Sequence, residues 1–158
     1  MPTRFEVMNQ AMNQVKHWQD GFKWESVPIL KYKEEDSHFK NITRQVLFEG
    51  DPLLPVQWRY FEIDSEGNST LERHEHIHVV MIIRGSGNAL LGNQIVELNC
   101  FDVLQIPSYT WHQFRATNNE PLGFLCLVNK ERDKPQLPNA ENLEELRSDP
   151  QIAEFIRV

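Results

Sequence analysis

The sequence has little cysteine, no basic tract and no long apolar run. Its two cysteines, Cys100 and Cys126, are far apart and form no Cys-x-x-Cys pair, and each lies beside apolar residues. We therefore expect two reduced thiols in the core of a cytoplasmic protein. A net charge of -7 without a basic run argues against a nucleic-acid partner or an anionic membrane surface. No stretch is apolar for long enough to span a bilayer, and the first residues lack the apolar core of a signal peptide.

What the chain does have is enough apolar material for one core. It contains 158 residues, of which 40% are hydrophobic and 25% are charged. This length fits a single domain, and this balance is typical of a soluble globular protein rather than a disordered one.

Composition divides the chain into three parts. Residues 1–55 are polar and aromatic without a clean period, so we expect an irregular N-terminal segment that packs on the domain. Residues 56–129 alternate short strand-like runs with turn residues, which favours an all-β barrel or sandwich. Residues 130–158 begin as a charged, proline-containing linker and continue into a short helix. The runs expected to be strands are Val56–Ile63, Thr70–Glu75, Ile77–Arg84, Asn88–Leu91, Gln94–Leu98, Val103–Ile106, Trp111–Ala116 and Leu122–Val128.

The two flanking parts carry weaker patterns. In the first part, Met8–Trp18 is compatible with a short helix, and Val27–Tyr32 and Arg44–Phe48 are compatible with strands. In the last part, Asn139–Arg147 is expected to be a helix, with Asn139 or Asn142 as its N-cap.

Two of the predicted strands are apolar on both faces. Val79–Ile83 and Leu122–Val128 lack the alternation of a half-exposed strand, so their outer face must be covered. The N-terminal segment, the C-terminal helix or a second subunit could provide this cover. We expect a homodimer, because such a face is too apolar for water.

Three of the six histidines lie in one seven-residue stretch, Glu72-Arg73-His74-Glu75-His76-Ile77-His78. An apolar strand-like run and a Gly-Ser-Gly turn follow it. A fourth histidine, His112, comes after a second strand-like run and Pro107. Imidazoles and carboxylates that converge from neighbouring strands make a site for a first-row metal ion. The sequence therefore predicts a metal centre here.

This region resembles the cupin superfamily, whose members are small antiparallel β-barrels with two short motifs. The first motif reads glycine, five residues, His-x-His, three or four residues, glutamate, six residues, glycine. The second reads glycine, five residues, Pro-x-Gly, two residues, histidine, three residues, asparagine. The first motif's histidines and glutamate and the second motif's histidine commonly hold one metal ion. The resemblance implies a cupin-type double-stranded β-helix, or jelly-roll, barrel over residues 56–129.

The closing glycine of the first motif gives an alignment. Counted back from Gly85, His78 takes the place of the motif's glutamate, His74 that of its second histidine and Glu72 that of its first. Histidine in place of the glutamate is a familiar variation, and a carboxylate is an acceptable ligand for iron, manganese, zinc or nickel. The ligand set that the resemblance implies is Glu72, His74, His78 and His112.

Other registers exist for the same stretch. If His74 and His76 formed the His-x-His pair, the third ligand would be Val80 or Met81, and neither suits a divalent ion. With His76 in a turn between two strands, Glu72 is a ligand. In a straight strand, positions 72, 74, 76 and 78 share one face, so His76 becomes a ligand and Glu72 stays outside the coordination. Both of these sets remain open.

The second motif matches at its centre and differs at its edges. Pro107 and His112 are in place, whereas Phe101, Tyr109 and Ala116 stand where the motif has glycine, glycine and asparagine. These changes weaken the match to any particular cupin enzyme but leave the candidate ligand unchanged.

The function that the resemblance implies depends on free coordination positions. Three imidazoles and a carboxylate leave one or two positions of an octahedral ion for a substrate or dioxygen. Small cupins with a histidine-rich site resemble dioxygenases, which implies an oxidoreductase that acts on a small organic molecule through iron or manganese, or through zinc or nickel. The alternative is a non-catalytic module that binds a small molecule or a metal. Arg59 or Gln105 pointing at the site would favour an enzyme, and a dry, closed pocket would favour the binding module.

Overall fold

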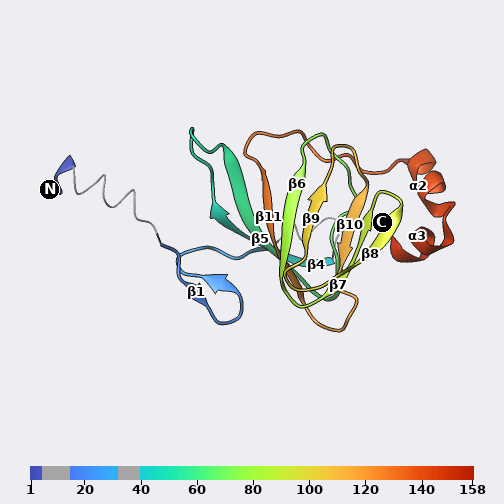
Figure 1. Cartoon of the computed structure of the whole chain (residues 1–158), viewed down its shortest axis with the longest axis horizontal. Helices are drawn as coiled ribbons and strands as arrows, with labels where there is room; N and C mark the ends of the chain where they lie inside the picture. The colour runs from blue at the N-terminus through green and yellow to red at the C-terminus, as the bar shows by residue number, and fades with distance from the viewer. Residues whose placement is uncertain (5–14, 32–39) are drawn as a thin grey trace.

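The computed structural model describes residues 1–4, 15–31 and 40–158, and its main feature is a curled antiparallel sheet followed by two short helices (Figure 1). The described chain is therefore of the all-β class. Its strands are β1 (Trp18–Gln19), β2 (Lys23–Trp24), β3 (Leu30–Lys31), β4 (Lys40–Phe48), β5 (Val56–Asn68), β6 (His78–Arg84), β7 (Gly87–Leu91), β8 (Gln94–Leu98), β9 (Val103–Ile106), β10 (His112–Arg115) and β11 (Leu122–Asn129). Its named helices are α2 (Ala140–Arg147) and α3 (Pro150–Phe155).

The long strand β5 organises the sheet, because it pairs with β4, β10 and β11. The strands follow the order β8-β7-β10-β5-β11-β6-β9, and every pairing is antiparallel. Directly paired residues point to the same face of a sheet. Cys126 of β11 pairs with Arg59 on one side and Val80 on the other, and all three are buried. The register therefore places an arginine and a cysteine side by side on the inner face.

The inside of the curled sheet is filled mainly with aromatic and branched side chains. The ring of Phe124 stacks on those of Phe114 and Phe61, with centroid distances of 4.6 and 5.7 Å. Their neighbours Ile63, Val80, Ile82, Leu122 and Ile106 are almost fully buried. This apolar wall surrounds the cavity at which the candidate site lies.

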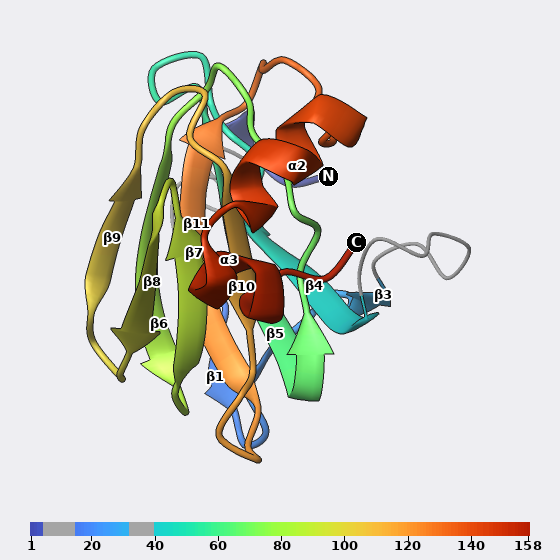
Figure 2. The same cartoon turned by 90° about the vertical axis from the view of Figure 1, so that its right-hand side faces the viewer.

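The C-terminal helices cover a second core beside the β7 and β10 strands (Figure 2). Asn139 caps α2 in a capping box with Asn142, and Asp149 caps α3, which satisfies amide donors at both helix starts. Leu146, Ile152 and Phe155 pack with Leu71 and Leu90 in this cluster. Neither these helices nor any other in the described part of the chain is long and apolar enough to cross a membrane.

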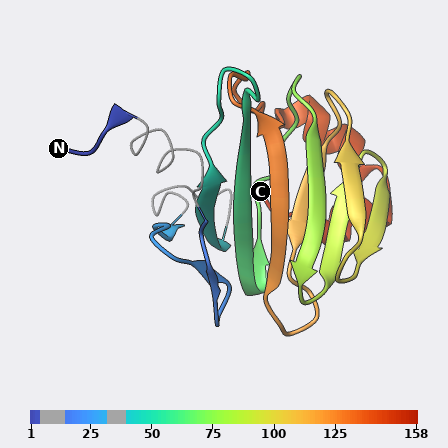
Figure 3. The same cartoon turned by 60° about the vertical axis from the view of Figure 1, so that its left-hand side comes forward.

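The hairpin of β1 and β2 covers part of the outer face of the sheet. Phe22 and Trp24 contact the ring of Tyr60, with centroids 5.9 and 5.1 Å away, so Tyr60 is buried on this side. Beyond this cover, β5, β11 and β6 lie side by side (Figure 3). There Val79 remains 40% exposed and Leu127 38% exposed. The described part of the N-terminal segment thus covers a portion of the apolar outer face and leaves Val79 and Leu127 partly exposed.

The structure confirms the predicted fold class and differs in some elements. The strands β8 and β9 have the predicted bounds, and Asn139 is the N-cap of α2 as one of the two alternatives had it. The strand expected at Val56–Ile63 continues to Asn68 as β5. The helix expected at Met8–Trp18 lies mostly outside the described residues, and its last residue, Trp18, is in β1.

Two local predictions were wrong. Thr70–Glu75 is not a regular strand, because Glu72 and Arg73 make only isolated bridges, to His112 and Gln136. Cys100 is exposed rather than in the core, since it lies in the connection between β8 and β9. Cys126 is buried, as expected.

Candidate metal centre

The histidine-rich stretch enters the barrel as an irregular segment between β5 and β6. Glu72 is tied to His112 through paired backbone hydrogen bonds of 3.2 and 3.0 Å. The chain then bends at residues 75–76 and joins β6 at His78. Because of this bend, His74, His76 and His78 do not lie on one straight strand. Their rings nevertheless gather in a stack, with centroids 3.7 Å apart for His74 and His76 and 4.4 Å apart for His74 and His78.

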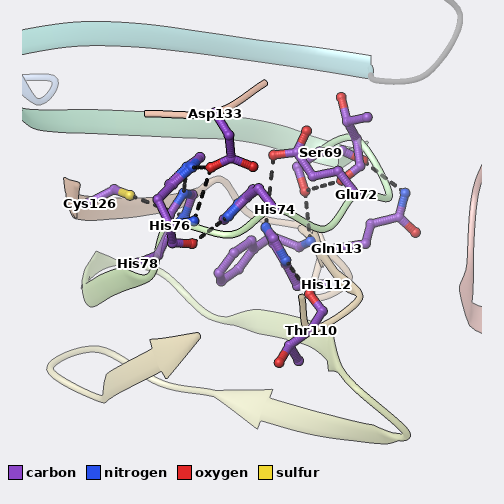
Figure 4. Close-up of polar contacts among 12 residues, drawn as sticks. Ser69, Glu72, His74, His76, His78, Thr110, His112, Gln113, Cys126 and Asp133 are labelled. Carbon is purple, nitrogen blue, oxygen red and sulfur yellow. Dashed lines mark hydrogen bonds and ion pairs between the residues drawn. The ribbon is translucent and has the colours of Figure 1, made fainter. Parts of the chain in front are cut away.

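Each of four rings is held at its Nδ1 atom (Figure 4). Nδ1 of His74 lies 2.6 Å from the carbonyl oxygen of His76, and Nδ1 of His112 lies 2.9 Å from that of Thr110. A carbonyl only accepts, so these Nδ1 atoms carry the hydrogen and leave Nε2 as a free lone pair. Such anchoring is what orients histidines that bind a metal through Nε2.

The remaining two rings follow the same pattern with different partners. Nδ1 of His76 donates to the carboxylate of Asp133 at 2.7 Å, and Nδ1 of His78 lies 3.5 Å from Sγ of Cys126. The Nε2 atoms of His76 and His78 face each other at 3.3 Å. Two nitrogen lone pairs so close repel each other unless a proton or a cation lies between them.

The donor atoms form two overlapping groups, each of which could hold a cation. One group that could hold a metal ion is formed by His74, His76 and His78, and a second by Glu72, His74 and His112, so His74 belongs to both. Within each group the ligand atoms lie within 4.8 Å of one another. Nε2 of His74 is buried and has no hydrogen-bond partner in the described structure, which is costly for a polar atom unless an ion or a proton donor satisfies it. Imidazole and carboxylate are ligands that divalent transition metals accept.

Burial favours the neutral form of three of the imidazoles and the protonated form of the Glu72 carboxyl group. It lowers the pKa of His112 to about 4, and it lowers the pKa of His78 and of His74. Burial also raises the pKa of Glu72 to about 7, although the nearby Arg59 guanidinium acts in the opposite direction. Neutral imidazole is the form that binds a metal, so these histidines are ready for a cation at neutral pH.

Asp133 connects the segment after β11 to the histidine-rich bend. Its two carboxylate oxygens accept hydrogen bonds from the backbone N–H groups of Glu75 at 2.8 Å and His76 at 3.0 Å, besides that from the His76 ring. These donors hold the pKa of the Asp133 carboxyl well below its usual range. Close by, Gln136 exchanges two backbone hydrogen bonds with Arg73. The part expected to be only a linker therefore fastens the bend that carries His76.

A cavity adjoins the cluster on the inner face of the sheet. Its volume is about 70 Å³, and it is partly open to solvent. Ring faces of phenylalanines form much of its wall, and its polar lining includes Arg59, Thr70, Glu72 and Cys126. Nη2 of Arg59 donates to Sγ of Cys126 at 3.3 Å, and burial raises the pKa of this thiol. A ligand in this cavity would touch a thiol, a guanidinium and the metal-binding side chains together.

The two altered glycine positions of the second motif keep a glycine-like backbone. Phe101 has a φ of 74° and Tyr109 a φ of 55°, both in the left-handed region that side chains other than glycine rarely adopt. The Tyr109 N–H donates to the carbonyl oxygen of His74 at 2.7 Å, so this turn supports the metal-binding segment. Two residues with side chains therefore adopt a backbone conformation that favours glycine at the motif's two glycine positions.

The structure brings all five predicted candidates, Glu72, His74, His76, His78 and His112, to one place. Sequence reasoning missed Asp133, which lies 57 residues from His76 and carries no motif of its own. It also treated Cys126 only as a core residue. The sequence did not show whether the Arg59 side chain points into the barrel, and the strand register places it on the inner face. Gln105, the other candidate, lies at an exposed position of β9.

Comparisons with known proteins agree with this geometry. A family model described as a cupin domain matches residues 59–128. The chain is 49% identical over 140 residues to the 1-methylthio-D-xylulose 5-phosphate methylsulfurylase of Rhodospirillum rubrum, covering 88% of this chain and 89% of that protein.

Two solved structures agree along nearly the whole chain. A cupin 2 conserved barrel domain protein from Rhodopseudomonas palustris is 48% identical with a TM-score of 0.88, and the match covers 92% of this chain and 100% of the other. A cupin-2 domain protein from Rhodospirillum rubrum is 48% identical with a TM-score of 0.81, over 89% and 95% of the two chains. Identity of this level over most of the length means that the chain belongs to the cupin superfamily.

Proposed function

We propose that the five clustered side chains hold one divalent transition-metal ion. His74, His78 and His112 belong to both of the ligand sets that the sequence allows, and Glu72 and His76 compete for the remaining place. The buried Nε2 of His74, which lacks a partner in the described structure, is the observation that supports an ion here. Iron or manganese suits a mixed imidazole and carboxylate set, and zinc or nickel is also compatible with it.

We further propose that the protein is an enzyme that transfers a methylthio group from a small sugar phosphate. Support comes from the relative in Rhodospirillum rubrum, whose name states a 1-methylthio ketose phosphate as its substrate. It also comes from the cavity, in which the Cys126 thiol lies next to the metal-binding side chains. The inward-facing Arg59 is the polar wall that favours an enzyme over a purely binding module.

The chain's own residues suggest how such a transfer would proceed. In a 1-methylthio ketose the sulfur is bonded to the carbon next to the carbonyl. The Cys126 sulfur, in thiolate form, would attack the methylthio sulfur, so that an S–S bond forms and the C–S bond breaks. The electron pair remains on that carbon as an enolate, which then takes up a proton to give the 1-deoxy ketose. A small external thiol would attack the methyl disulfide left on Cys126, carry away the methylthio group as a mixed disulfide and restore the thiol.

Two groups are placed to favour the thiolate. Nη2 of Arg59 donates a hydrogen bond to the Cys126 sulfur, and Nδ1 of His78 lies 3.5 Å from the same sulfur. With His78 bound to a metal through Nε2, its Nδ1 carries a hydrogen and becomes a second donor to the sulfur. A divalent ion would supply Lewis-acid stabilisation of negative charge on a carbonyl oxygen.

The test compares the wild type with Cys126→Ala and with Cys100→Ala, which removes the exposed thiol as a matched control. Manganese-loaded protein is mixed with 1-methylthio-D-xylulose 5-phosphate and a thiol, and mass spectrometry follows the sugar product and any methylthio adduct on the protein. We expect turnover and an adduct in the wild type and in Cys100→Ala, and neither in Cys126→Ala. Equal turnover in Cys126→Ala would refute the nucleophile.

The dioxygenase chemistry predicted from the sequence remains testable in the same samples. Oxygen uptake with the iron-loaded protein, without loss of the methylthio group, would favour it over group transfer. Binding of the sugar phosphate with neither reaction would favour the non-catalytic module.

A further inference from the structure

Arg59 is a buried charge that forms no ion pair within the described structure, although the Glu72 carboxyl group is near enough for its pKa to respond to the guanidinium. Its side chain lies on the inner face of β5, and the residue is 6% exposed. The described ion pairs join His76 to Asp133, Arg84 to Glu62 and His112 to Glu72, and Arg59 takes part in none of them. Its contacts are the hydrogen bond to Cys126 and the ring of Phe61, 4.8 Å from the guanidinium carbon. Neither contact neutralises a full positive charge.

Such a charge is expensive unless something compensates it. A guanidinium removed from water loses several kcal/mol of hydration, which neutral contacts restore only in part. Here the surroundings are apolar, since Phe61, Phe114 and Phe124 line the same cavity. Nε of Arg59 is itself buried without a hydrogen-bond partner in the described structure. An anion that enters the cavity would provide the missing compensation.

The charges around the cavity favour an anion of more than one negative charge. Glu72 is the acidic side chain in the lining, and its carboxylate is also a candidate ligand for the cation. A divalent ion and Arg59 together carry three positive charges, against one on Glu72. The hydroxyl of Thr70 lies in the same lining, and no hydrogen bond of this hydroxyl to another described residue is present, so it adds a free donor. Phosphate monoesters match this combination, because the planar guanidinium fork pairs with phosphate oxygens.

We propose that Arg59, with Thr70, forms an anion subsite that binds the phosphate group of the substrate inside the barrel. The identity of that substrate as a sugar phosphate rests on the proposed function, whereas the subsite itself can be tested without turnover. Arg59 then has two roles. Its Nη2 atom contacts the Cys126 sulfur, and the guanidinium charge holds the phosphate at the far end of the same small molecule. A substrate lacking the phosphate would leave this charge buried and unpaired.

The experiment uses the full chain freed of metal by a chelator, so that no bound cation can hold the anion. Inorganic phosphate is titrated by calorimetry into the wild type, Arg59→Met, Arg59→Lys and Arg147→Met. Arg147 is an exposed arginine of α2 and serves as the matched control for general charge. We expect Arg59→Met to bind phosphate at least about tenfold more weakly than the wild type, because charge-assisted bonds are the strong ones. Arg59→Lys should lie between them, and Arg147→Met should equal the wild type.

Thermal unfolding keeps the test valid if Arg59→Met affects folding. Phosphate should raise the melting temperature of the wild type and of Arg147→Met, and leave that of Arg59→Met unchanged. Without phosphate, Arg59→Met should melt at or above the wild-type temperature, since it removes an uncompensated buried charge. Equal phosphate binding in wild type and Arg59→Met, or none in the wild type, would overturn the subsite. Methylthio transfer that fails while phosphate binding depends on Arg59 would reject the proposed reaction and leave the subsite in place.

Discussion

The Asp133→Asn substitution tests whether the segment after β11 controls the metal centre. Asp133 contacts none of the Nε2 atoms that face the cluster. Its carboxylate accepts hydrogen bonds from two backbone N–H groups and from Nδ1 of His76. Asparagine has one acceptor oxygen in place of two, so it cannot satisfy all three donors, and it removes the negative charge that favours the hydrogen on Nδ1. His76 would lose both its orientation and part of its basicity.

The expected loss of metal affinity can be estimated from the contact between Asp133 and the His76 ring. Groups that orient a metal-bound histidine typically contribute about 10–100-fold to metal affinity, which corresponds to about 1.4–2.7 kcal/mol. The Asp133 side chain is 30% exposed, so the lower part of this range is expected. The measurement is competition for manganese or zinc against a chromophoric chelator. Asp64→Asn, at an exposed aspartate that bonds only its neighbour Ser65, is the control.

The outcome also separates the two ligand sets. A loss of affinity in Asp133→Asn, with Asp64→Asn unchanged, means that His76 is a ligand or supports one. Wild-type affinity in Asp133→Asn would refute this reasoning and leave Glu72 as the fourth ligand beside His74, His78 and His112.

Five further predictions follow from the same structure. His112→Ala and His78→Ala should lose most bound metal by elemental analysis, and whichever of Glu72→Ala and His76→Ala also empties the site identifies the fourth ligand. Metal uptake should release protons and strengthen from pH 4 to pH 7, since Glu72 with a pKa of about 7 and His112 with a pKa of about 4 must both be deprotonated to bind; a pH-independent affinity would contradict this. Without metal, the raised pKa of Glu72 should make the protein less stable in urea as the pH rises from about 4.5 through 7, and the lowered pKa of His112 should make it less stable as the pH falls from about 6.5 through 4. Tyr109→Gly should raise the free energy of unfolding by about 0.5–1 kcal/mol, because it relieves a positive φ; a decrease would mean that the ring makes contacts that outweigh the strain. Light scattering should show a homodimer held by the exposed apolar face of β6 and β11, and a monomer would contradict it.

Regular strands were predictable because their signal is local. Turn residues flank β8 and β9 at both ends, and the structure reproduces the expected bounds. The end of β5 was not predictable in this way. Its residues 64–68 are typical of a turn, yet Asn68 pairs with Lys40 on one side and Arg115 on the other, which is a contact between distant parts of the chain.

The candidate site was likewise predictable only where its signal is local in the sequence. The site was found because His74, His78 and His112, with Glu72, follow a spacing that a known barrel uses, and local spacing is visible in a sequence. The roles of Asp133 and Cys126 were not predicted, because each depends on a residue distant in the sequence, His76 in one case and Arg59 in the other. Arg59 itself needed the strand register, since a shift of one residue would have turned it outward.

The anchoring of four imidazoles at Nδ1 has a consequence for which ion the protein takes up. A ring fixed by a carbonyl, a carboxylate or a sulfur cannot swing freely to follow a larger or smaller cation. The spacing of the Nε2 atoms, such as the 3.3 Å between His76 and His78, is then a property of the barrel wall. Selection between ions of similar intrinsic affinity therefore becomes a matter of radius and preferred geometry. The hydrogen bonds behind the rings, rather than the nitrogen atoms in front of them, set that preference.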